Sequence, residues 1–174
     1  MNDFIHSGGE RILRDPKFVT RTEDYVPYMV TEFNGHMYPT KRFDQEERLV
    51  EHSMRHLRVQ NQAALDPHIS AAFGWCAFDY NTHYDFGSGD RICYHGVMDM
   101  FRIPKMAGHF YGSQVDPKVK PVVEPATLWT LGERGGAGVL PLVIFTNCDS
   151  IKVKLHGQEV GEWFPAKDQY QGEI

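Results

Sequence analysis

Apolar residues are spaced in two different ways in the first two thirds of the chain. Residues 25–32 (YVPYMVTE) and 69–80 (ISAAFGWCAFDY) are short apolar runs without strict alternation, which is typical of strands covered on both faces. Residues 42–65 between them repeat at helical spacing and predict an amphipathic helix. The predicted stripe consists of Val50, Met54, Leu57, Asn61 and Ala64. Strand, helix and strand predict a βαβ unit with parallel strands.

Shorter elements flank this unit. In RILRDPKF (residues 11–18), a short helix is expected to end at Pro16, because a residue before proline avoids the helical region. The long polar and aromatic segment 81–103 predicts a functional loop. Residues 104–114 predict a second helix that packs back on the sheet. One face of that helix would carry Met106, Ala107, Phe110 and Tyr111.

The pattern changes after a proline-rich stretch at residues 115–125, which we interpret as a linker or domain border. Short strands are expected over residues 139–147, 150–157 and 158–164, with a hairpin turn at HGQ. In residues 150–157, apolar and polar positions alternate, as they do in a half-exposed antiparallel strand of a β-sandwich.

This organisation predicts an α/β fold that is incomplete by itself. Residues 1–115 are expected to be the last βα units of a TIM (β/α)₈ barrel, which needs ~250 residues when closed. Residues 116–174 would be the first strands of an immunoglobulin-like β-sandwich. The chain would then be a fragment of a larger enzyme. A small self-contained α+β domain is the competing interpretation.

Composition narrows the classes of partner. The chain has 174 residues and a net charge of −5, which argues against nucleic acid as the main partner. The apolar runs are shorter than the ~20 residues of a membrane helix, and the first residues do not resemble a signal peptide. Cys76, Cys93 and Cys148 form no CxxC pair, so we expect three buried or half-buried thiols.

Candidate chemistry centres on Glu32, which ends the strand YMVTE and precedes a glycine-containing turn. Catalytic groups of (β/α)₈ barrels lie at the carboxyl ends of strands, so Glu32 and Trp75 would meet at one mouth. The structural alternative is that Glu32 forms an ion pair with Lys41 or Arg42.

The remaining motifs carry no further chemistry. His52 and His56 have helical i, i+4 spacing, but HSMRH lacks the glutamate of HExxH, so we expect a solvated helix face rather than a metal site. DFG (85–87) and GERGGAG (132–138) lack the companion motifs of phosphate-binding proteins. We expect no metal and no cofactor.

The segments TEFNGHMYPTKRFDQEER and GWCAFDYNTHYDFGSGDRICYHGVMDMFRIPK resemble glycoside hydrolase family 2, the β-galactosidase-type retaining glycosidases. The resemblance covers about residues 15–115, and residues 120–174 resemble the start of the sandwich that follows the barrel in that family. It implies that Glu32 is the nucleophile and that Trp75 forms the floor of the sugar subsite. His36, Asp79, Asn81 and His83 would hold the sugar.

Two departures from the family pattern qualify the expected activity. The family's acid/base glutamate belongs to an Asn-Glu pair, which this sequence does not contain, and the N-terminal sandwich domains are absent. We therefore expect the isolated chain to be inactive. ICYHG (92–96) replaces the Asn-x-Lys motif of β-glucuronidases, which favours a neutral sugar such as galactose over a uronic acid.

Expectations on partners follow from the same resemblance. We expect the chain to bind a carbohydrate and to bind neither nucleic acid nor a membrane. Exposed barrel edges would also allow the chain to self-associate. Family analogy favours a periplasmic or secreted location. The alternative function is a non-catalytic carbohydrate-binding or structural module in which Trp75, Tyr80 and Tyr84 stack on sugar.

Overall fold

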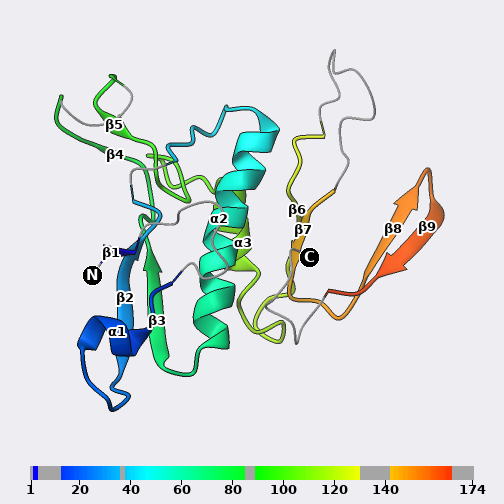
Figure 1. The fold of residues 1–174 in the computed structure, drawn as a ribbon. Helices are drawn as coiled ribbons and strands as arrows, with labels where there is room; N and C mark the ends of the chain where they lie inside the picture. Colours follow the sequence, from blue (N-terminus) through cyan, green and yellow to red (C-terminus); the bar gives the residue numbers. More distant parts are fainter. Residues whose placement is uncertain (1, 4–12, 36–37, 85–88, 130–141, 166–174) are drawn as a thin grey trace.

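The computed structural model describes residues 2–3, 13–35, 38–84, 89–129 and 142–165. Its centre is a parallel sheet in the order β1 (Asn2–Asp3), β2 (Tyr28–Phe33) and β3 (Ile69–Gly74) (Figure 1). Helix α2 (Glu46–Leu65) connects β2 to β3. The predicted βαβ unit is therefore confirmed, although β3 ends at Gly74 rather than continuing to residue 80.

The buried side of α2 differs from the predicted stripe. Met54 is buried as predicted, and so are Leu49, Val59 and Ala63, which were not in the stripe, whereas Ala64 is exposed and Leu57 only half-buried. The buried side of α2 is thus shifted by about one residue from the predicted stripe. It includes the polar residues His52, Ser53 and His56. An apolar pattern could not identify a side that is built partly from polar residues.

The two short helices also correct details of the prediction. Pro16 begins helix α1 (Pro16–Thr20) instead of ending one, and the Asp15 side chain caps it by accepting from the Lys17 N–H at 2.9 Å. Proline suits a first helical turn because that N–H has no partner within the helix. Helix α3 (Met106–Gly112) buries Met106, Ala107 and Phe110 as predicted, but it packs chiefly against α2 rather than on the sheet.

The remaining strands form two-stranded antiparallel pairs. Strands β4 (Tyr80–Asn81) and β5 (Ile92–Cys93) pair within the long loop. Strand β6 (Val123–Pro125) pairs with β7 (Ile144–Thr146), and β8 (Ile151–Leu155) pairs with β9 (Gln158–Trp163). The predicted β8–β9 hairpin is confirmed, and its turn uses positive φ at His156 and Gly157. Sheets of two or three strands close neither a barrel nor a sandwich within the residues that are described.

Two separate apolar clusters include residues of α2. The first joins the sheet to the helix and contains Leu13, Tyr28, Val30, Phe33, Val59, Ala63 and Ile69. The second joins α2 and α3 to the β6–β7 region and contains Leu49, Met106, Phe110, Ala126 and Phe145. Glu46 strengthens the second contact, since its carboxylate accepts from Thr127 Oγ1 at 3.0 Å and from the Leu128 N–H at 2.7 Å.

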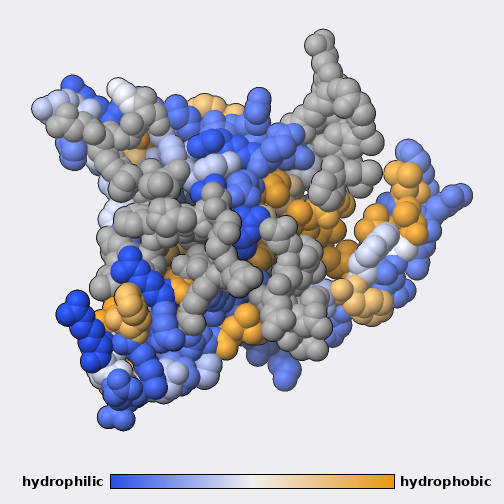
Figure 2. Space-filling model, viewed as in Figure 1, coloured by the Kyte–Doolittle hydropathy of each residue, from blue (hydrophilic) through white to orange (hydrophobic). Residues whose placement is uncertain are grey.

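The β8–β9 hairpin exposes apolar side chains to solvent. Figure 2 shows hydrophobic surface on the β6–β9 side of the molecule. On the hairpin and just after it, Leu155, Val160, Trp163 and Phe164 are exposed. No helix in the described part of the chain has the length and apolar character of a membrane span.

Candidate functional site

The carboxyl ends of β2 and β3 lie side by side. Phe33 pairs with Gly74 in the sheet, and the Trp75 N–H donates to the Phe33 carbonyl at 2.7 Å. Glu32 is half-buried and immediately precedes Phe33, and Trp75 immediately follows Gly74. The parallel pairing therefore brings a carboxylate and an indole to the same edge of the sheet, where the sequence predicted them.

The segment after β3 adds accessible groups to this edge. The Trp75 side chain is 38% exposed and meets the Tyr80 ring edge-on, with ring centroids 6.0 Å apart. The pKa of the Tyr80 phenol is raised, mainly by burial and to a smaller extent by a hydrogen bond with Cys93. Asn81 and His83 are exposed further along the segment. Aromatic surface with a few nearby polar groups is the usual composition of a small-molecule binding site.

Asp79 occupies a different environment from the one expected for a sugar ligand. Its side chain is buried, and Oδ1 accepts from Lys105 Nζ at 2.7 Å and from the Gly96 N–H at 2.9 Å. Burial raises the pKa of Asp79 and lowers that of Lys105, while the contact between them opposes both shifts. The structure thus gives Asp79 a role in holding loops together rather than in touching a ligand.

The segment that follows Glu32 is attached to α2. The guanidinium groups of Arg48 and Arg55 lie 4.2 and 4.1 Å from the Tyr38 ring centroid. Arg48 also donates to the Pro39 carbonyl at 2.9 and 2.6 Å. His36, a predicted sugar ligand, lies outside the described residues.

The cations named as structural partners of Glu32 have other acids beside them. Lys41 Nζ lies 3.6 Å from the Asp90 carboxylate, and Arg42 Nε lies 3.3 Å from that of Asp99. These contacts favour the interpretation in which Glu32 is presented to a ligand over the one in which it pairs with either cation.

His52 and His56 contradict the prediction of a solvated helix face. Both are buried, with ring centroids 5.0 Å apart, and His56 Nδ1 hydrogen-bonds with the Tyr111 hydroxyl at 2.9 Å. Burial lowers the pKa of both, that of His56 to about 3. The residues that the structure describes contain no group of three or more side chains able to hold a metal ion. The pair is part of the contact between α2, β2 and α3.

The thiols fit the expectation from the sequence. Cys76, Cys93 and Cys148 are free, Cys93 is buried, and the other two are half-buried. Cys93 Sγ lies 2.9 Å from His95 Nδ1, and burial raises the pKa of Cys76 to about 12. A thiol with a raised pKa is a poor nucleophile, so Cys76 is unsuited to that role.

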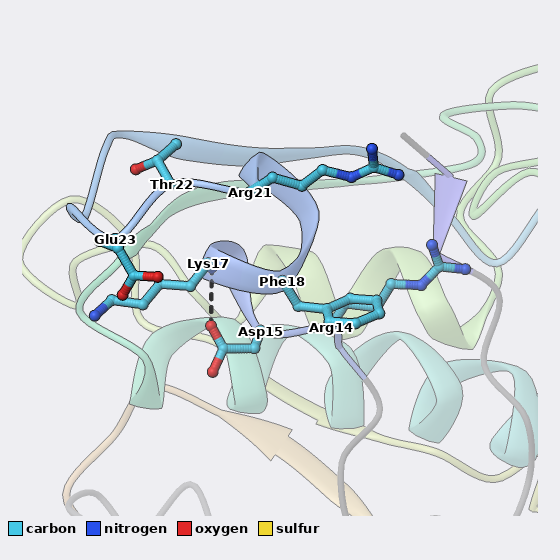
Figure 3. A pocket seen from close by; sticks show the side chains of 7 residues that line it. All are labelled: Arg14, Asp15, Lys17, Phe18, Arg21, Thr22 and Glu23. Carbon is cyan, nitrogen blue, oxygen red and sulfur yellow. Dashed lines mark hydrogen bonds between the residues drawn. The ribbon is translucent and has the colours of Figure 1, made fainter.

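A shallow pocket lies beside α1, before the start of β2 (Figure 3). It is lined by Arg14, Asp15, Lys17, Phe18, Arg21, Thr22 and Glu23. Acids and bases are mixed in its wall, and it lies away from the carboxyl ends of the strands. Its composition therefore favours no particular ligand.

Sequence reasoning missed the importance of Lys105, which is 1% exposed. It is the residue before α3, where a lysine is ordinarily solvated. The available signal was its position after Pro104 between apolar residues, and this signal does not specify a buried partner.

Comparison with known proteins finds relatives named β-galactosidase. The chain is 60% identical over 172 residues to a β-galactosidase of Thermoanaerobacterium thermosulfurigenes, covering 98% of this chain and 24% of that protein. It is 44% identical over 164 residues to a β-galactosidase of Rhizobium meliloti, covering 88% of this chain and 22% of that protein. The chain thus spans about a quarter of the length of these curated relatives. No family model matches the sequence.

Solved structures agree at the level of the fold. A Bacteroides uniformis β-glucuronidase, covalently bound to cyclophellitol-6-carboxylate aziridine, superposes with a TM-score of 0.61 at 22% identity, over 80% of this chain and 18% of that one. An FMN-binding β-glucuronidase from Facaelibacterium prausnitzii gives a TM-score of 0.58 at 20% identity, over 86% of this chain and 23% of that one. The curated relatives and the solved structures are all glycosidases, and they fit the resemblance to one portion of a glycoside hydrolase family 2 enzyme.

Proposed function

We propose that the chain is part of a retaining β-glycosidase of the β-galactosidase type, which hydrolyses β-linked neutral sugars through a glycosyl-enzyme intermediate. The observation that carries this proposal is the position of Glu32 at the carboxyl end of β2, next to Trp75 at the end of the parallel strand β3. The relatives named β-galactosidase support the neutral sugar.

In this mechanism the Glu32 carboxylate attacks the anomeric carbon and forms a covalent ester. A second carboxyl, ~5–5.5 Å away, protonates the leaving oxygen and later activates water. The acid/base glutamate would belong to the longer enzyme outside these 174 residues, since the sequence has no Asn-Glu pair. We therefore propose that the isolated chain is inactive.

Trp75 would support the apolar face of the bound pyranose, because a flat indole complements the C–H groups of a sugar ring. Asn81, His83 and His36 would bond its hydroxyl groups. Residues 1–115 would complete the barrel, and residues 116–174 would begin the following sandwich. Asp79 is better placed to shape the loop than to contact the sugar, because Lys105 and Gly96 already occupy its Oδ1.

The decisive variant is Glu32→Gln in the full-length enzyme, meaning this chain at the complete length of its relatives. Removing one of several catalytic residues that act together lowers kcat by about 10⁴-fold or more. Turnover of an aryl β-galactoside and binding of galactose should be measured together. We expect turnover to be abolished while binding persists.

Glu47→Gln is the matched control, because Glu47 is an exposed glutamate on α2. It should retain full turnover. A fluorinated galactoside inactivator should label Glu32 in the parent enzyme. Label on another residue, or unchanged turnover in Glu32→Gln, would overturn the assignment of the nucleophile.

A non-catalytic sugar-binding module is the second candidate. The exposed rings of Trp75 and Tyr84, at 38% and 76%, favour it because exposed aromatic rings stack on sugars without any chemistry. The Glu32→Gln experiment separates the two functions, since turnover would be abolished if Glu32 is the nucleophile and unchanged if this chain only binds sugar.

A further inference from the structure

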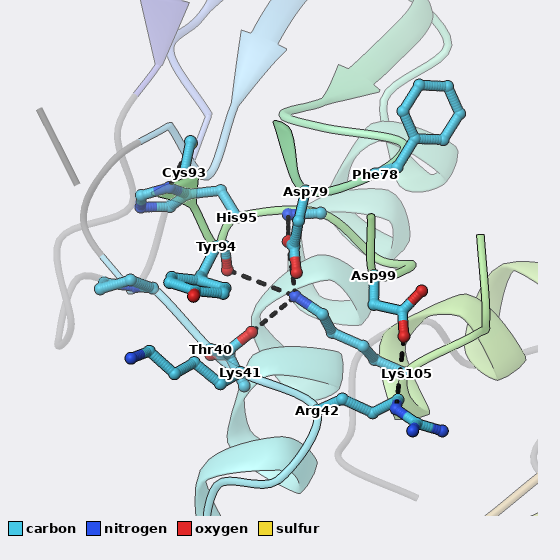
Figure 4. A network of polar contacts seen from close by, with 12 residues as sticks. Thr40, Lys41, Arg42, Phe78, Asp79, Cys93, Tyr94, His95, Asp99 and Lys105 are labelled. Carbon is cyan, nitrogen blue, oxygen red and sulfur yellow. Dashed lines mark hydrogen bonds and ion pairs between the residues drawn. The ribbon is translucent and has the colours of Figure 1, made fainter. Parts of the chain in front are cut away.

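The side chain of Lys105 is the most completely buried cation in the part of the chain that the structure describes. Its Nζ donates to Asp79 Oδ1 at 2.7 Å, to the Thr40 carbonyl at 2.6 Å and to the Tyr94 carbonyl at 3.4 Å (Figure 4). The three donors of an ammonium group therefore have three acceptors.

These acceptors come from three different loops. Thr40 belongs to the segment that follows β2 and Glu32, and Asp79 to the segment that follows β3 and Trp75. Tyr94 follows β5. One ammonium group thus connects the loop after the proposed nucleophile with the loop after the proposed sugar-binding indole.

Main-chain hydrogen bonds reinforce the same junction. The Thr40 N–H donates to the Tyr94 carbonyl at 2.8 Å, and the Lys105 N–H donates to the Val97 carbonyl at 2.9 Å. A Cβ at Gly96 would clash with the main chain of Phe78 and Asp79, so the segment carrying Gly96 and the segment carrying Asp79 approach as closely as backbone allows. The segment carrying Asp79 therefore has little freedom to shift.

Stability alone is a weak reason to bury such a pair. Removing an ammonium and a carboxylate from water is costly, and well-packed apolar residues often serve stability equally well. A buried pair that bonds two further carbonyls instead fixes one arrangement of the loops.

We propose that Lys105 is a positioning residue for the glycosidase reaction: it fixes the loop after Glu32 relative to the loop after Trp75. This inference rests on the function proposed above. Lys105 need not touch the substrate, because it acts through Thr40 and Asp79. Misplacement of reacting groups by about 1 Å lowers the rate by about 10²-fold, which sets the expected size of the effect.

The test uses the full-length enzyme with Lys105→Met, which removes the ammonium but keeps the chain length. Because this variant leaves the Asp79 carboxylate buried without its cation, it can unfold for that reason alone. The double variant Asp79→Asn/Lys105→Met removes both charges and so avoids this problem. Lys118→Met, at an exposed lysine after α3, is the matched control.

Turnover of an aryl β-galactoside and the rate of trapping by a fluorinated galactoside are measured at 25 °C, together with the thermal midpoint of each variant. We expect kcat and the trapping rate to fall by about 10²-fold in both Lys105 variants, although the double variant regains most of the thermal midpoint. Lys118→Met should match the parent enzyme.

Recovery of kcat along with the thermal midpoint in the double variant would overturn the proposal, because Lys105 would then only compensate a charge. A parental kcat in either Lys105 variant would overturn it as well. Glu32→Gln, assayed in parallel, separates this failure from that of the function. An inactive Glu32→Gln with fully active Lys105 variants would remove only the role of Lys105, whereas an active Glu32→Gln would remove the nucleophile.

Discussion

The two faces of the parallel sheet have opposite environments. On the face toward α2, Val30 and Phe33 are at most 1% exposed, whereas Met29 is 52% and Phe73 is 55% exposed. All four side chains are apolar, so composition does not cause the difference. The chain supplies a helix layer for one face, and no described element covers the other. Large apolar groups on an uncovered face are what the interior of a larger barrel would require.

The largest effect on stability is expected on the covered face. Phe33→Ala should lower the free energy of unfolding by about 3–5 kcal/mol, because it removes a buried ring that contacts His56. Phe73→Ala is the matched variant on the uncovered face and should cost about 0.5 kcal/mol or less in the 174-residue chain. Urea denaturation of both variants checks the contrast, and equal losses would end the distinction between the faces.

The stability cost of Phe73→Ala should also be measured in the full-length enzyme. If further strands cover this face there, the same substitution should approach the cost of Phe33→Ala. A persistently small loss would mean that the face stays open in the larger protein.

An intermediate effect is expected at Gly96, where the loops at the strand ends meet. Gly96→Ala would drive a Cβ against the backbone at Phe78, Asp79 and Met98, which cannot give way as side chains do. We expect a loss of about 1–3 kcal/mol or more in the free energy of unfolding. Gly112→Ala is the control, since nothing lies within 4 Å of its added Cβ. Thermal unfolding of the two variants should differ clearly, and equal midpoints would contradict the close approach.

Acid should destabilise the covered face specifically. His52 and His56 have pKa values below the ordinary 6.5 when folded, that of His56 about 3. The unfolded chain therefore binds more protons between these values, and stability that is complete above pH 6.5 declines as the pH falls towards 3. The urea concentration at the midpoint of denaturation should therefore be lower at pH 4.5 than at pH 7.5.

Replacing both histidines by glutamine should flatten this dependence. His156→Asn, at the exposed hairpin turn, should leave it unchanged. An undiminished slope in the double variant would assign the acid sensitivity to other groups.

The smallest effect on stability is expected from polar residues on the uncovered face. The 174-residue chain should self-associate through that face, as exposed apolar surface favours association. Met29→Ser/Phe73→Ser should shift light-scattering masses towards the monomer while changing the free energy of unfolding by only about 0.5 kcal/mol. A monomeric parent chain would contradict the predicted association.

The success of the sequence analysis depended on how local each signal was. Two unalternating apolar runs around a helical repeat predicted the parallel β2–β3 pair, and His156-Gly157 predicted a hairpin, because neighbouring residues determine both. The resemblance pointed to Glu32 and Trp75; the structure has both at adjacent strand ends, while their roles toward a sugar stay a prediction.

The failures arose where distant residues decide the environment. His52 and His56 appear polar in any pattern, yet the Phe33 and Tyr111 rings enclose His56. Lys105 finds Asp79 and Thr40 at separations of 26 and 65 residues, which no local spacing encodes. Pro16 was compatible with either end of a helix, and only the Asp15 cap decides between them.

The contact between α2 and the β6–β7 region has a practical consequence for dividing this molecule. The change in pattern near residue 115 suggests a place to cut, yet Ala126 and Phe145 complete the cluster around Leu49 and Phe110. Protease nicking within residues 115–121 would leave two pieces that stay attached through these side chains and through Glu46. Ending a shortened protein there would instead strip α2 and α3 of their outer cover, so a soluble truncation should retain the strands as far as Thr146.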